Sequence, residues 1–489
     1  EWGVRVSGAM SSSSSNVVTP HKLLRSYHEE CKSRNVEPLA SVVEALESCG
    51  AENRLFETVE CRDEPVDVNQ ARALSIVLVH NASMNTLALD ACDLRDAALE
   101  ILLEACKERK NVLPSLFLSM NNLSPKGFLK LSKFLEGPPS VFTLDLSGNT
   151  VNTKSATHLA SALKSELCAL QTLQLVSCSM SRKALSALAA GLVKNQFLHT
   201  LILSDNGFDW KCAEILAQVL VQNNTLTSLD LRENVVKDRG VAFLASALCS
   251  NTALLSLSMW DNQIGPNGFS SVAECLIQNS SLKSLEMGKN IIGLDGAEAI
   301  KDSLLENNSL TFLGLAGSGL DSEGMVALSE ALSVNHSLQR LDIRRNELGL
   351  AGFMALSNAM KFNSTVVMIT YDPVSPPSSS SSKEDASGDE EHSDGDTQDL
   401  TILEMISQFQ EAIDQVTRNN SASSSEALSL AEGQDLEPGS PPPRERAVIV
   451  DGEDGGRRRG RRVRFAEGGE VLVDSPTTVA ALERAVLEE

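Results

Sequence analysis

A cluster of basic and apolar residues near the C-terminal end has the residue types and spacing for binding chemistry. Val463 and Phe465 are separated by one residue, so in an extended segment both side chains point to the same side. Such a segment can add a strand to a partner's sheet edge and bury each apolar side chain for about 1.5–3 kcal/mol before ordering costs. The surrounding arginines can pair with acidic groups or act as a nuclear localisation signal; they are Arg457, Arg458, Arg459, Arg461, Arg462 and Arg464.

Residue sets that catalyse reactions are not recognisable in the sequence. The seven histidines form no ligand pair, and neither a GxxxxGK[ST] phosphate loop nor a GxSxG elbow occurs. The ten cysteines, scattered from Cys31 to Cys275, form no CxxC pair that would indicate zinc. We therefore expect a protein without enzymatic activity, metal or cofactor.

Composition narrows the class of partner and the compartment. The net charge of −23 argues against nucleic acid, because phosphate binding needs a basic face. No apolar run approaches the roughly 18 residues that span a bilayer, and the first residues show no signal peptide. We expect no membrane association and reduced thiols in the cytoplasm, the nucleus or both. The missing initiator methionine indicates a fragment or a predicted gene product.

A repeat occupies most of the chain and must position any binding surface. Its pattern is Leu-x-Leu-x-x-Asn-x-Leu, as in the segment 116–123, and it recurs every 28 or 29 residues. This period and consensus are typical of a leucine-rich repeat solenoid, whose stacked units present a surface rather than a pocket. The first leucines are Leu87, Leu116, Leu144, Leu173, Leu201, Leu229, Leu257, Leu285, Leu313 and Leu341.

One repeat unit predicts one strand and one helix. Leu229 and Leu231 alternate as in a strand with one buried face, and Asn234 follows where the chain must turn. Gly240 marks the entry to a helix whose apolar residues recur at helical spacing. The fold class is therefore α/β, a horseshoe solenoid resembling the ribonuclease-inhibitor type over residues 55–372, with a helical cap at 19–54 after a disordered N-terminus at 1–18.

Side chains between the buried leucines point to the concave face, where we expect a second protein partner. Trp260 is the strongest candidate, since an exposed tryptophan among charges is a common interface residue, although its ring can also lie flat over neighbouring strands. The other candidates are Arg232, Arg344 and Arg345. Most remaining charges on this face are expected to be solvated, among them Asp205, Asp230, Asp261, Glu286, Lys289 and Asp342.

Residues 373–489 lose the periodicity. Their composition predicts a disordered tail, because it cannot bury enough apolar area to offset chain entropy. A short amphipathic helix at 400–417 interrupts it, and we expect this helix to dock on the solenoid, to pair with a partner or to form only transiently. Possible phosphorylation sites are Ser387 and Ser393, each with an acidic residue three positions later, and Ser475 before a proline.

One segment of the tail resembles a known docking motif. Arg462-Val463-Arg464-Phe465 resembles the RVxF docking motif of protein phosphatase 1 regulatory subunits, and Val471-Leu472 matches the spacing of their secondary two-hydrophobe element. Arg464 at the variable position leaves no phosphorylation switch inside the motif. The resemblance implies docking on phosphatase 1 through Arg462, Val463, Phe465, Val471 and Leu472.

The solenoid and tail together resemble the protein phosphatase 1 regulatory subunit 37 family. The resemblance rests on Ser26-Tyr27-x-x-x-Cys31, on Leu257-x-Met259-Trp260-x-Asn262 and on the acidic serine-rich tail. In that family the docking motif precedes the repeats, whereas here the good copy begins at Arg462. The family implies a non-catalytic scaffold that binds the phosphatase 1 catalytic subunit and inhibits or targets it.

Two other functions fit the same sequence. A Ran-type GTPase-activating protein also joins long leucine-rich repeats to an acidic tail, and it would need an arginine such as Arg232 or Arg344 near the partner's phosphates. A generic leucine-rich repeat scaffold for an unknown protein partner is the third hypothesis.

Overall fold

The computed structural model describes residues 18–109, 111–137, 141–373, 394–432, 448–450, 461–464 and 470–473. Within 394–432 it describes side chains for residues 402–423. The chain divides into two units, Glu1–Ser423 and Ser424–Glu489.

The first unit contains a parallel sheet of twelve strands that pair in sequence order. From β2 to β11 the buried leucine of each strand aligns with that of the next, as in Leu87 opposite Leu116 and Leu116 opposite Leu144. Val59 and Ile369 take this position in β1 and β12. This register confirms the predicted stacking of one strand per repeat. The strands are β1 (Thr58–Arg62), β2 (Thr86–Asp90), β3 (Ser115–Phe117), β4 (Thr143–Asp145), β5 (Thr172–Gln174), β6 (Thr200–Ile202), β7 (Ser228–Asp230), β8 (Ser256–Ser258), β9 (Ser284–Glu286), β10 (Phe312–Gly314), β11 (Arg340–Asp342) and β12 (Met368–Thr370).

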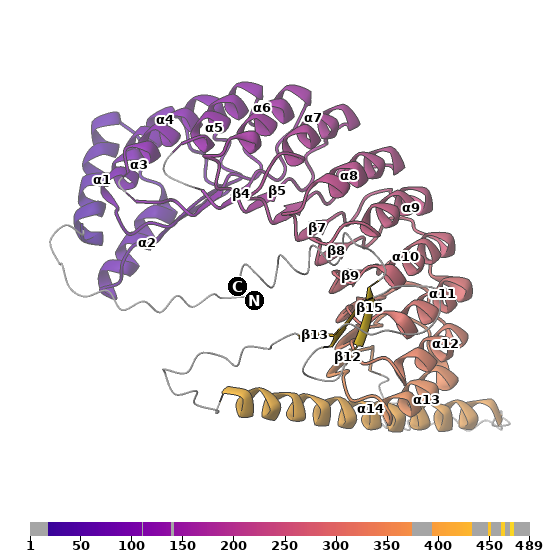
Figure 1. Cartoon of the computed structure of the whole chain (residues 1–489). Helices are drawn as coiled ribbons and strands as arrows, with labels where there is room; N and C mark the ends of the chain where they lie inside the picture. The colour runs from indigo at the N-terminus through magenta and orange to yellow at the C-terminus, as the bar shows by residue number, and fades with distance from the viewer. Residues whose placement is uncertain are drawn as a thin grey trace, which may run out of the picture. The chain divides into compact units, whose positions relative to one another are not determined.

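A helix follows each strand from β1 to β11, and these helices form the outer, convex layer over the strands (Figure 1). The apolar core lies between the two layers, where strand leucines such as Leu229 and helix residues such as Leu244 are buried. The helices are α3 (Val68–His80), α4 (Arg95–Lys107), α5 (Pro125–Leu135), α6 (Thr153–Lys164), α7 (Arg182–Leu192), α8 (Trp210–Gln222), α9 (Lys237–Leu248), α10 (Pro266–Gln278), α11 (Gly293–Glu306), α12 (Ser322–Leu332) and α13 (Gly349–Met360).

The recurring helix glycine has a packing role rather than the expected role at the helix entry. Gly240 lies in the first turn of α9, after the helix has begun at Lys237. A Cβ there would come within 3.0 Å of the Cα of Trp210 and the Cβ of Ala213 on the preceding helix. Glycine at this position therefore lets neighbouring helices approach closely.

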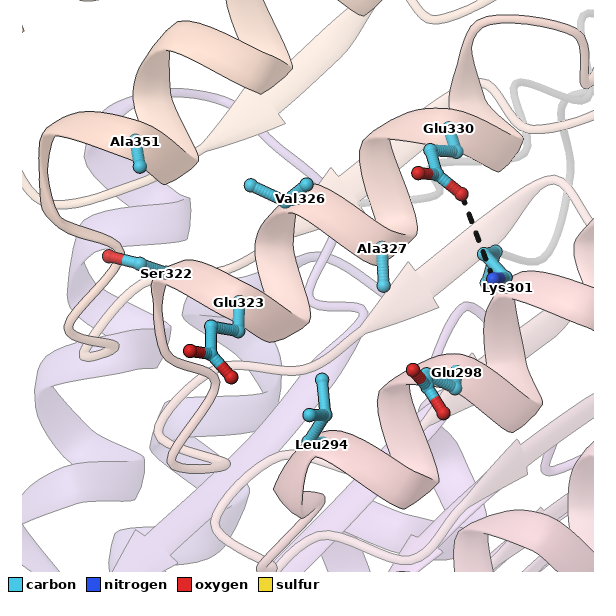
Figure 2. Close-up of a pocket in the computed structure, with 9 residues that line it drawn as sticks. All are labelled: Leu294, Glu298, Lys301, Ser322, Glu323, Val326, Ala327, Glu330 and Ala351. Carbon is cyan, nitrogen blue, oxygen red and sulfur yellow. Dashed lines mark ion pairs between the residues drawn. The ribbon is translucent and has the colours of Figure 1, made fainter.

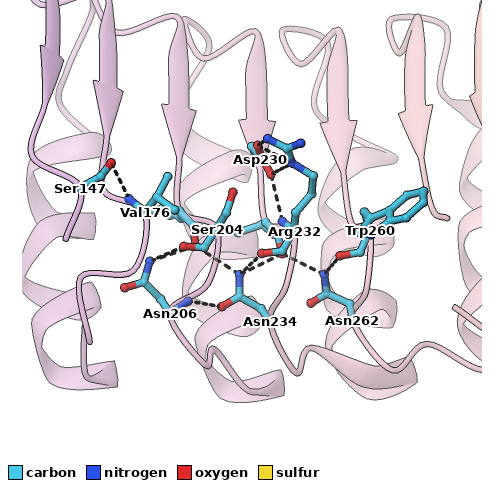
Figure 3. A network of polar contacts seen from close by, with 11 residues as sticks. Ser147, Val176, Ser204, Asn206, Asp230, Arg232, Asn234, Trp260 and Asn262 are labelled. Atoms are coloured by element: carbon cyan, nitrogen blue, oxygen red, sulfur yellow. Dashed lines mark hydrogen bonds and ion pairs between the residues drawn. The ribbon is translucent and has the colours of Figure 1, made fainter. Parts of the chain in front are cut away.

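Two rows of asparagines connect the repeats. After each strand, an amide such as that of Asn234 donates to the carbonyls of Leu203 and Leu231 at 3.2 and 2.9 Å, and it accepts from the N–H groups of Asn206 and Phe208 (Figure 3). These bonds satisfy backbone groups that the turn would leave unpaired.

Cysteine replaces this asparagine in two repeats and keeps part of its role. The thiol of Cys92 donates to the carbonyl of Cys61 at 3.4 Å, and that of Cys178 donates to Leu146 at 3.5 Å. Burial raises the pKa of Cys92 to about 11 and that of Cys178 to about 12. Both thiols are therefore protonated at neutral pH, in agreement with a structural role.

The second row of asparagines follows the helices and explains the Asn-x-Ser/Thr sequons. Asn279 donates to the carbonyls of Leu248 and Asn251 at 2.7 and 3.1 Å. Its side chain is buried, as are the equivalent amides of Asn307, Asn335 and Asn363. The sequons are therefore polar turns between helix and strand.

Two helices, α1 (Pro20–Arg34) and α2 (Ala40–Ala51), close the N-terminal end of the sheet. Leu23, Tyr27 and Cys31 are buried on one stripe of α1. The Tyr27 hydroxyl accepts a 3.0 Å hydrogen bond from the N–H of Leu39, just before α2. This contact fixes the two cap helices relative to each other.

A long helix, α14 (Asp394–Glu432), belongs to this unit as far as Ser423, and this part of it closes the C-terminal end of the solenoid. Ile406 and Ile413 are buried in the core, and the Tyr371 hydroxyl donates to Asp414 Oδ1 at 2.6 Å. Asn420 donates to the carbonyls of Asn363 and Val366 at 3.1 and 2.9 Å, so it continues the asparagine row where no further repeat follows.

This cap differs from the predicted tail. The sequence indicated disorder over 373–489 with a helix only at 400–417, whereas the structure places residues 394–432 in one helix. The local sequence pattern predicts too short a helix, because most of the stability of a helix comes from tertiary packing, here against the last repeat.

The second unit contains three short antiparallel strands in the order β13-β14-β15. They are β13 (Val448–Val450), β14 (Arg461–Arg464) and β15 (Glu470–Val473). In this register Val463 lies opposite both Ile449 and Val471.

Candidate protein-binding surface on the concave face

A hollow of about 520 Å³ lies on the concave face of the sheet, from β6 to β10. Its lining includes Arg232, Trp260, Glu286 and Phe312. Parallel strands in this register place the third residue of each strand in one row, with neighbouring strands about 4.8 Å apart. From β6 to β11 that row consists of Ile202, Asp230, Ser258, Glu286, Gly314 and Asp342.

Trp260 forms part of the floor of the hollow, in the turn after β8. Its indole ring lies over Gly288, since a Cβ at Gly288 would collide with two ring carbons and would come within 2.6 Å of the Ala316 carbonyl oxygen. The ring therefore lies flat along the sheet, one of the two arrangements expected from the sequence. The side chain is only partly buried, so one face of it remains available in the hollow.

Two aspartate–arginine pairs flank the hollow. Arg232 Nη2 lies 2.6 Å from Asp230 Oδ2, and Nε donates to both oxygens of the same carboxylate (Figure 3). The Asp230 side chain is 13% exposed and that of Arg232 is 51% exposed. The pairing neutralises a nearly buried carboxylate while leaving half of the guanidinium accessible.

The pair formed by Asp342 and Arg344 repeats this geometry on β11, with Nη2 2.6 Å from Oδ2. Burial alone would raise the pKa of Asp342, but the hydrogen bonds from Arg344 outweigh it and lower this pKa. Arg344 and Arg345 do not line the hollow. The structure therefore groups Arg232 with Trp260 but does not bring the predicted arginine pair to the same place.

Glu286 lies at the centre of the row without an ion-pair partner among the described residues. Burial raises the pKa of its carboxyl group, and a 3.2 Å hydrogen bond from the N–H of Gly288 opposes this shift. Its oxygens lie over Gly314, where a Cβ would come within 2.5 Å of them. A half-buried carboxylate without a cation is the least satisfied charge of this surface.

Two further groups of the hollow were missed by the sequence interpretation. The ring of Phe312 lies 4.9 Å from the guanidinium carbon of Arg340. The hydroxyl oxygen of Ser258, in the row between Asp230 and Glu286, is buried without a hydrogen-bond partner among the described residues. An alignment of the repeats at their leucines would have shown that these residues lie on neighbouring strands of the concave face. It would not have shown which groups they contact.

The residues predicted to dock on the phosphatase lie in the second unit. Arg462 and Val463 belong to β14, and Val471 and Leu472 to β15, where Leu472 lies opposite Arg462. Phe465 lies outside the described residues, as do the possible phosphorylation sites Ser387, Ser393 and Ser475.

The described part of the chain shows no candidate metal site. No group of three or more His, Cys, Asp or Glu side chains there could hold a metal ion. Among the same residues, no helix is both long and apolar enough to cross a bilayer.

Comparison with known proteins agrees with this architecture. A family model described as "Leucine Rich repeat" matches residues 222–245, 278–301 and 334–357, which are two repeats apart. Together with the strand register and the 28-residue period, this match decides the fold. The chain is a leucine-rich repeat solenoid.

Relatives of the solenoid share only part of its length. Human NACHT, LRR and PYD domains-containing protein 5 is 34% identical over 130 residues, which cover 27% of this chain and 11% of that protein. Human NACHT, LRR and PYD domains-containing protein 14 is 32% identical over 133 residues, which cover 27% of this chain and 12% of that protein. The chain thus spans about a tenth of the length of these curated relatives. The solved structure of the yeast Rad7–Elc1 complex contains a chain that is 18% identical in sequence. The match covers 72% of this chain and 87% of that one, with a TM-score of 0.42.

Proposed function

We propose that this solenoid is a non-catalytic scaffold that binds a protein segment in the concave hollow and recruits protein phosphatase 1 through the tail. The observation that carries the first part is the unpaired, half-buried Glu286 beside the flat ring of Trp260. A surface of this kind suits a protein segment better than a small molecule, because it is open along the strands and lined by several repeats.

The charges of the hollow specify the partner's chemistry. Of the carboxylates that line the hollow, Asp230 already holds Arg232 and Glu233 is exposed, so Glu286 is the half-buried one left for an incoming lysine or arginine. The same cation would lie beside the face of Trp260, where a cation–π contact adds about 0.5–2 kcal/mol. The unpartnered hydroxyl of Ser258 can bond to the partner's backbone. A segment with one basic side chain therefore fits the site.

Two variants test this part of the proposal. Peptides selected from a random library on the full-length protein should be enriched in lysine or arginine, and Trp260→Ala should weaken them by about thirtyfold or more. Met120→Ala is the matched control, because Met120 is an exposed apolar residue after β3, far along the sheet from the hollow. Selected peptides that bind Trp260→Ala as tightly as wild type would contradict the proposal.

Recruitment of phosphatase 1 rests on the RVxF-like segment. An extended conformation is what strand addition requires, and alternation puts Val463 and Phe465 on one side of the segment. Val463→Ala with Phe465→Ala should abolish capture of the purified phosphatase 1 catalytic subunit. Val486→Ala with Leu487→Ala, an apolar pair of the same tail outside the motif, should leave capture intact. Equal capture by both double variants would refute docking through this segment.

The GTPase-activating alternative is less well supported. Arg232 and Arg344 each pair through two nitrogens with the carboxylate two residues earlier in the chain, so the charge of each guanidinium is already balanced by an aspartate rather than left for a nucleotide phosphate. We therefore propose scaffolding, and inhibition or targeting of the phosphatase, rather than stimulated GTP hydrolysis.

A further inference from the structure

On the convex surface of the last two repeats, two helix positions that small or polar residues occupy in the preceding repeats hold exposed apolar side chains. Val326 on α12 and Met354 on α13 occupy the second position after the helix glycine and are 37% and 47% exposed. The same position in the three preceding repeats holds Ala242, Ser270 and Glu298. The residue before the buried asparagine changes in the same way.

At the position just before the buried asparagine, Val334 and Phe362 replace the polar residues Ser250, Gln278 and Glu306 of the preceding repeats. Phe362 is 74% exposed, although α14 bonds to the adjacent Asn363. The end cap therefore does not cover it. Clustered exposed apolar groups of this kind mark interaction sites more often than isolated ones do.

Two hollows lie within this patch. One of about 350 Å³ separates α11 from α12 and is lined by Leu294, Val326 and Ala327 (Figure 2). A second of about 240 Å³ lies between α12 and α13 and includes Phe362. Both hollows share the α12 residues Val326 and Glu330, so they adjoin at this helix, and the two hollows together are called the groove.

Carboxylates surround the groove. Glu298, Glu323 and Glu330 line the first hollow, and Figure 2 shows them around its apolar floor. Lys301 is the single basic residue of that lining, and its Nζ lies 3.7 Å from Glu330 and 3.9 Å from Asp302. The groove is therefore apolar inside and negatively charged at its edge.

We propose that this convex groove is a second docking site, which binds an amphipathic helix of a partner that carries lysines or arginines beside two large apolar residues. A helix fits because the convex face consists of helices and offers no strand edge for β-addition. Neighbouring helices lie about 8–10 Å apart, and residues i and i+7 of a helix are about 10.5 Å apart. Two apolar residues at that spacing can fill both hollows while basic residues reach the carboxylates.

A labelled synthetic peptide tests the groove on the full-length protein. The probe is a helical peptide with leucines at i and i+7 and lysines beside them, and its controls are a scrambled peptide of equal composition and a twin with glutamates for lysines. By fluorescence anisotropy, both controls should bind at least about tenfold more weakly, because they lack either the apolar face or the charge. A scrambled peptide that binds as tightly as the helix would show general ionic attraction and overturn the proposal, as would a probe that does not bind.

Variants locate the site. Val326→Ser with Phe362→Ser should weaken the probe at least about tenfold, because both side chains are exposed in the free protein and would be buried by the helix. Val221→Ser is the matched control, since Val221 is an exposed apolar residue of α8 outside the groove. Trp260→Ala should leave the affinity unchanged, which separates this site from the concave one. Equal binding by the double variant and wild type would refute the convex site.

Discussion

Replacement of Gly288 by alanine is the sharpest test of the concave floor. The added methyl group would collide with two ring carbons of Trp260 and would come within 2.6 Å of the Ala316 carbonyl oxygen. Real Cβ atoms seldom approach closer than 3.4 Å, so the ring must leave the floor and the turn that contains Ala316, after β10, must also shift. Because the indole is partly exposed, whereas the Ala316 carbonyl accepts a 2.7 Å hydrogen bond from the N–H of Lys289, we expect the ring to make the larger movement.

The expected magnitudes follow from this collision. Overpacking of a well-packed site costs about 1–3 kcal/mol of unfolding free energy. Displacement of the indole should also weaken concave peptides by about 2 kcal/mol, or about thirtyfold in Kd. In a background with Trp2→Phe and Trp210→Phe, the fluorescence of Trp260, then the single tryptophan, should shift to the red because its ring gains exposure to water.

A double-mutant cycle separates the collision from other effects of the substitution. Trp260→Ala removes the ring, so Gly288→Ala should cost less in that background than in the wild type, by 1 kcal/mol or more in urea unfolding. Gly137→Ala is the control, since a Cβ at Gly137 meets no atom within 4 Å. If the two substitutions change the free energy of unfolding additively, or if the emission spectrum does not shift, the indole ring of Trp260 does not lie over Gly288 as described.

Three further predictions follow from the cap, the hollow and the thiols. Asn420→Ala should destabilise the last repeat by about 1–3 kcal/mol, seen as faster hydrogen exchange near Val366, because buried carbonyls lose their donor. The raised pKa of Glu286 means that its contribution to stability is present below the ordinary carboxyl range and is lost as pH rises through the folded pKa. Glu286→Gln should therefore be more stable than wild type at neutral pH but equally stable in acid, and a difference independent of pH would contradict this. Of the ten cysteines, all of which the structure describes, Cys249 alone is exposed, so one thiol should react with a maleimide before unfolding.

The repeat could be predicted from sequence because each of its signals is local and recurs. Leucines two residues apart and a turn asparagine every 28 residues dictate the strand, the turn and the register of β2 to β11. The unit before Leu87 lies within the predicted range 55–372, and it forms β1 and α3. Stacking adds little uncertainty, because each repeat contacts only its neighbours.

The site was less predictable because its geometry depends on residues one or two repeats away. The orientation of Trp260 follows from the absence of a side chain at Gly288, and the position of Glu286 follows from Gly314. The sequence contains both glycines, but their effect appears only when the repeats are aligned strand by strand. The extent of α14 is a similar case, since Asn420 finds its partners in Asn363 and Val366 only after the solenoid has formed.

The two candidate surfaces occupy opposite faces of the same part of the solenoid, and the architecture explains how they can differ. One position on the concave face lies in the turn just after each strand. It holds the small or aliphatic residues Ser147 and Val176 after β4 and β5, but Arg232 and Trp260 after β7 and β8. Strand residues that face the concave side alternate with buried leucines, so changing them leaves the core intact. The outward helix positions, such as Phe362, are likewise separated from the strands by that core. Substitutions on one face should therefore leave binding at the other unchanged, which makes the paired variants at Trp260 and Phe362 independent probes of two partners.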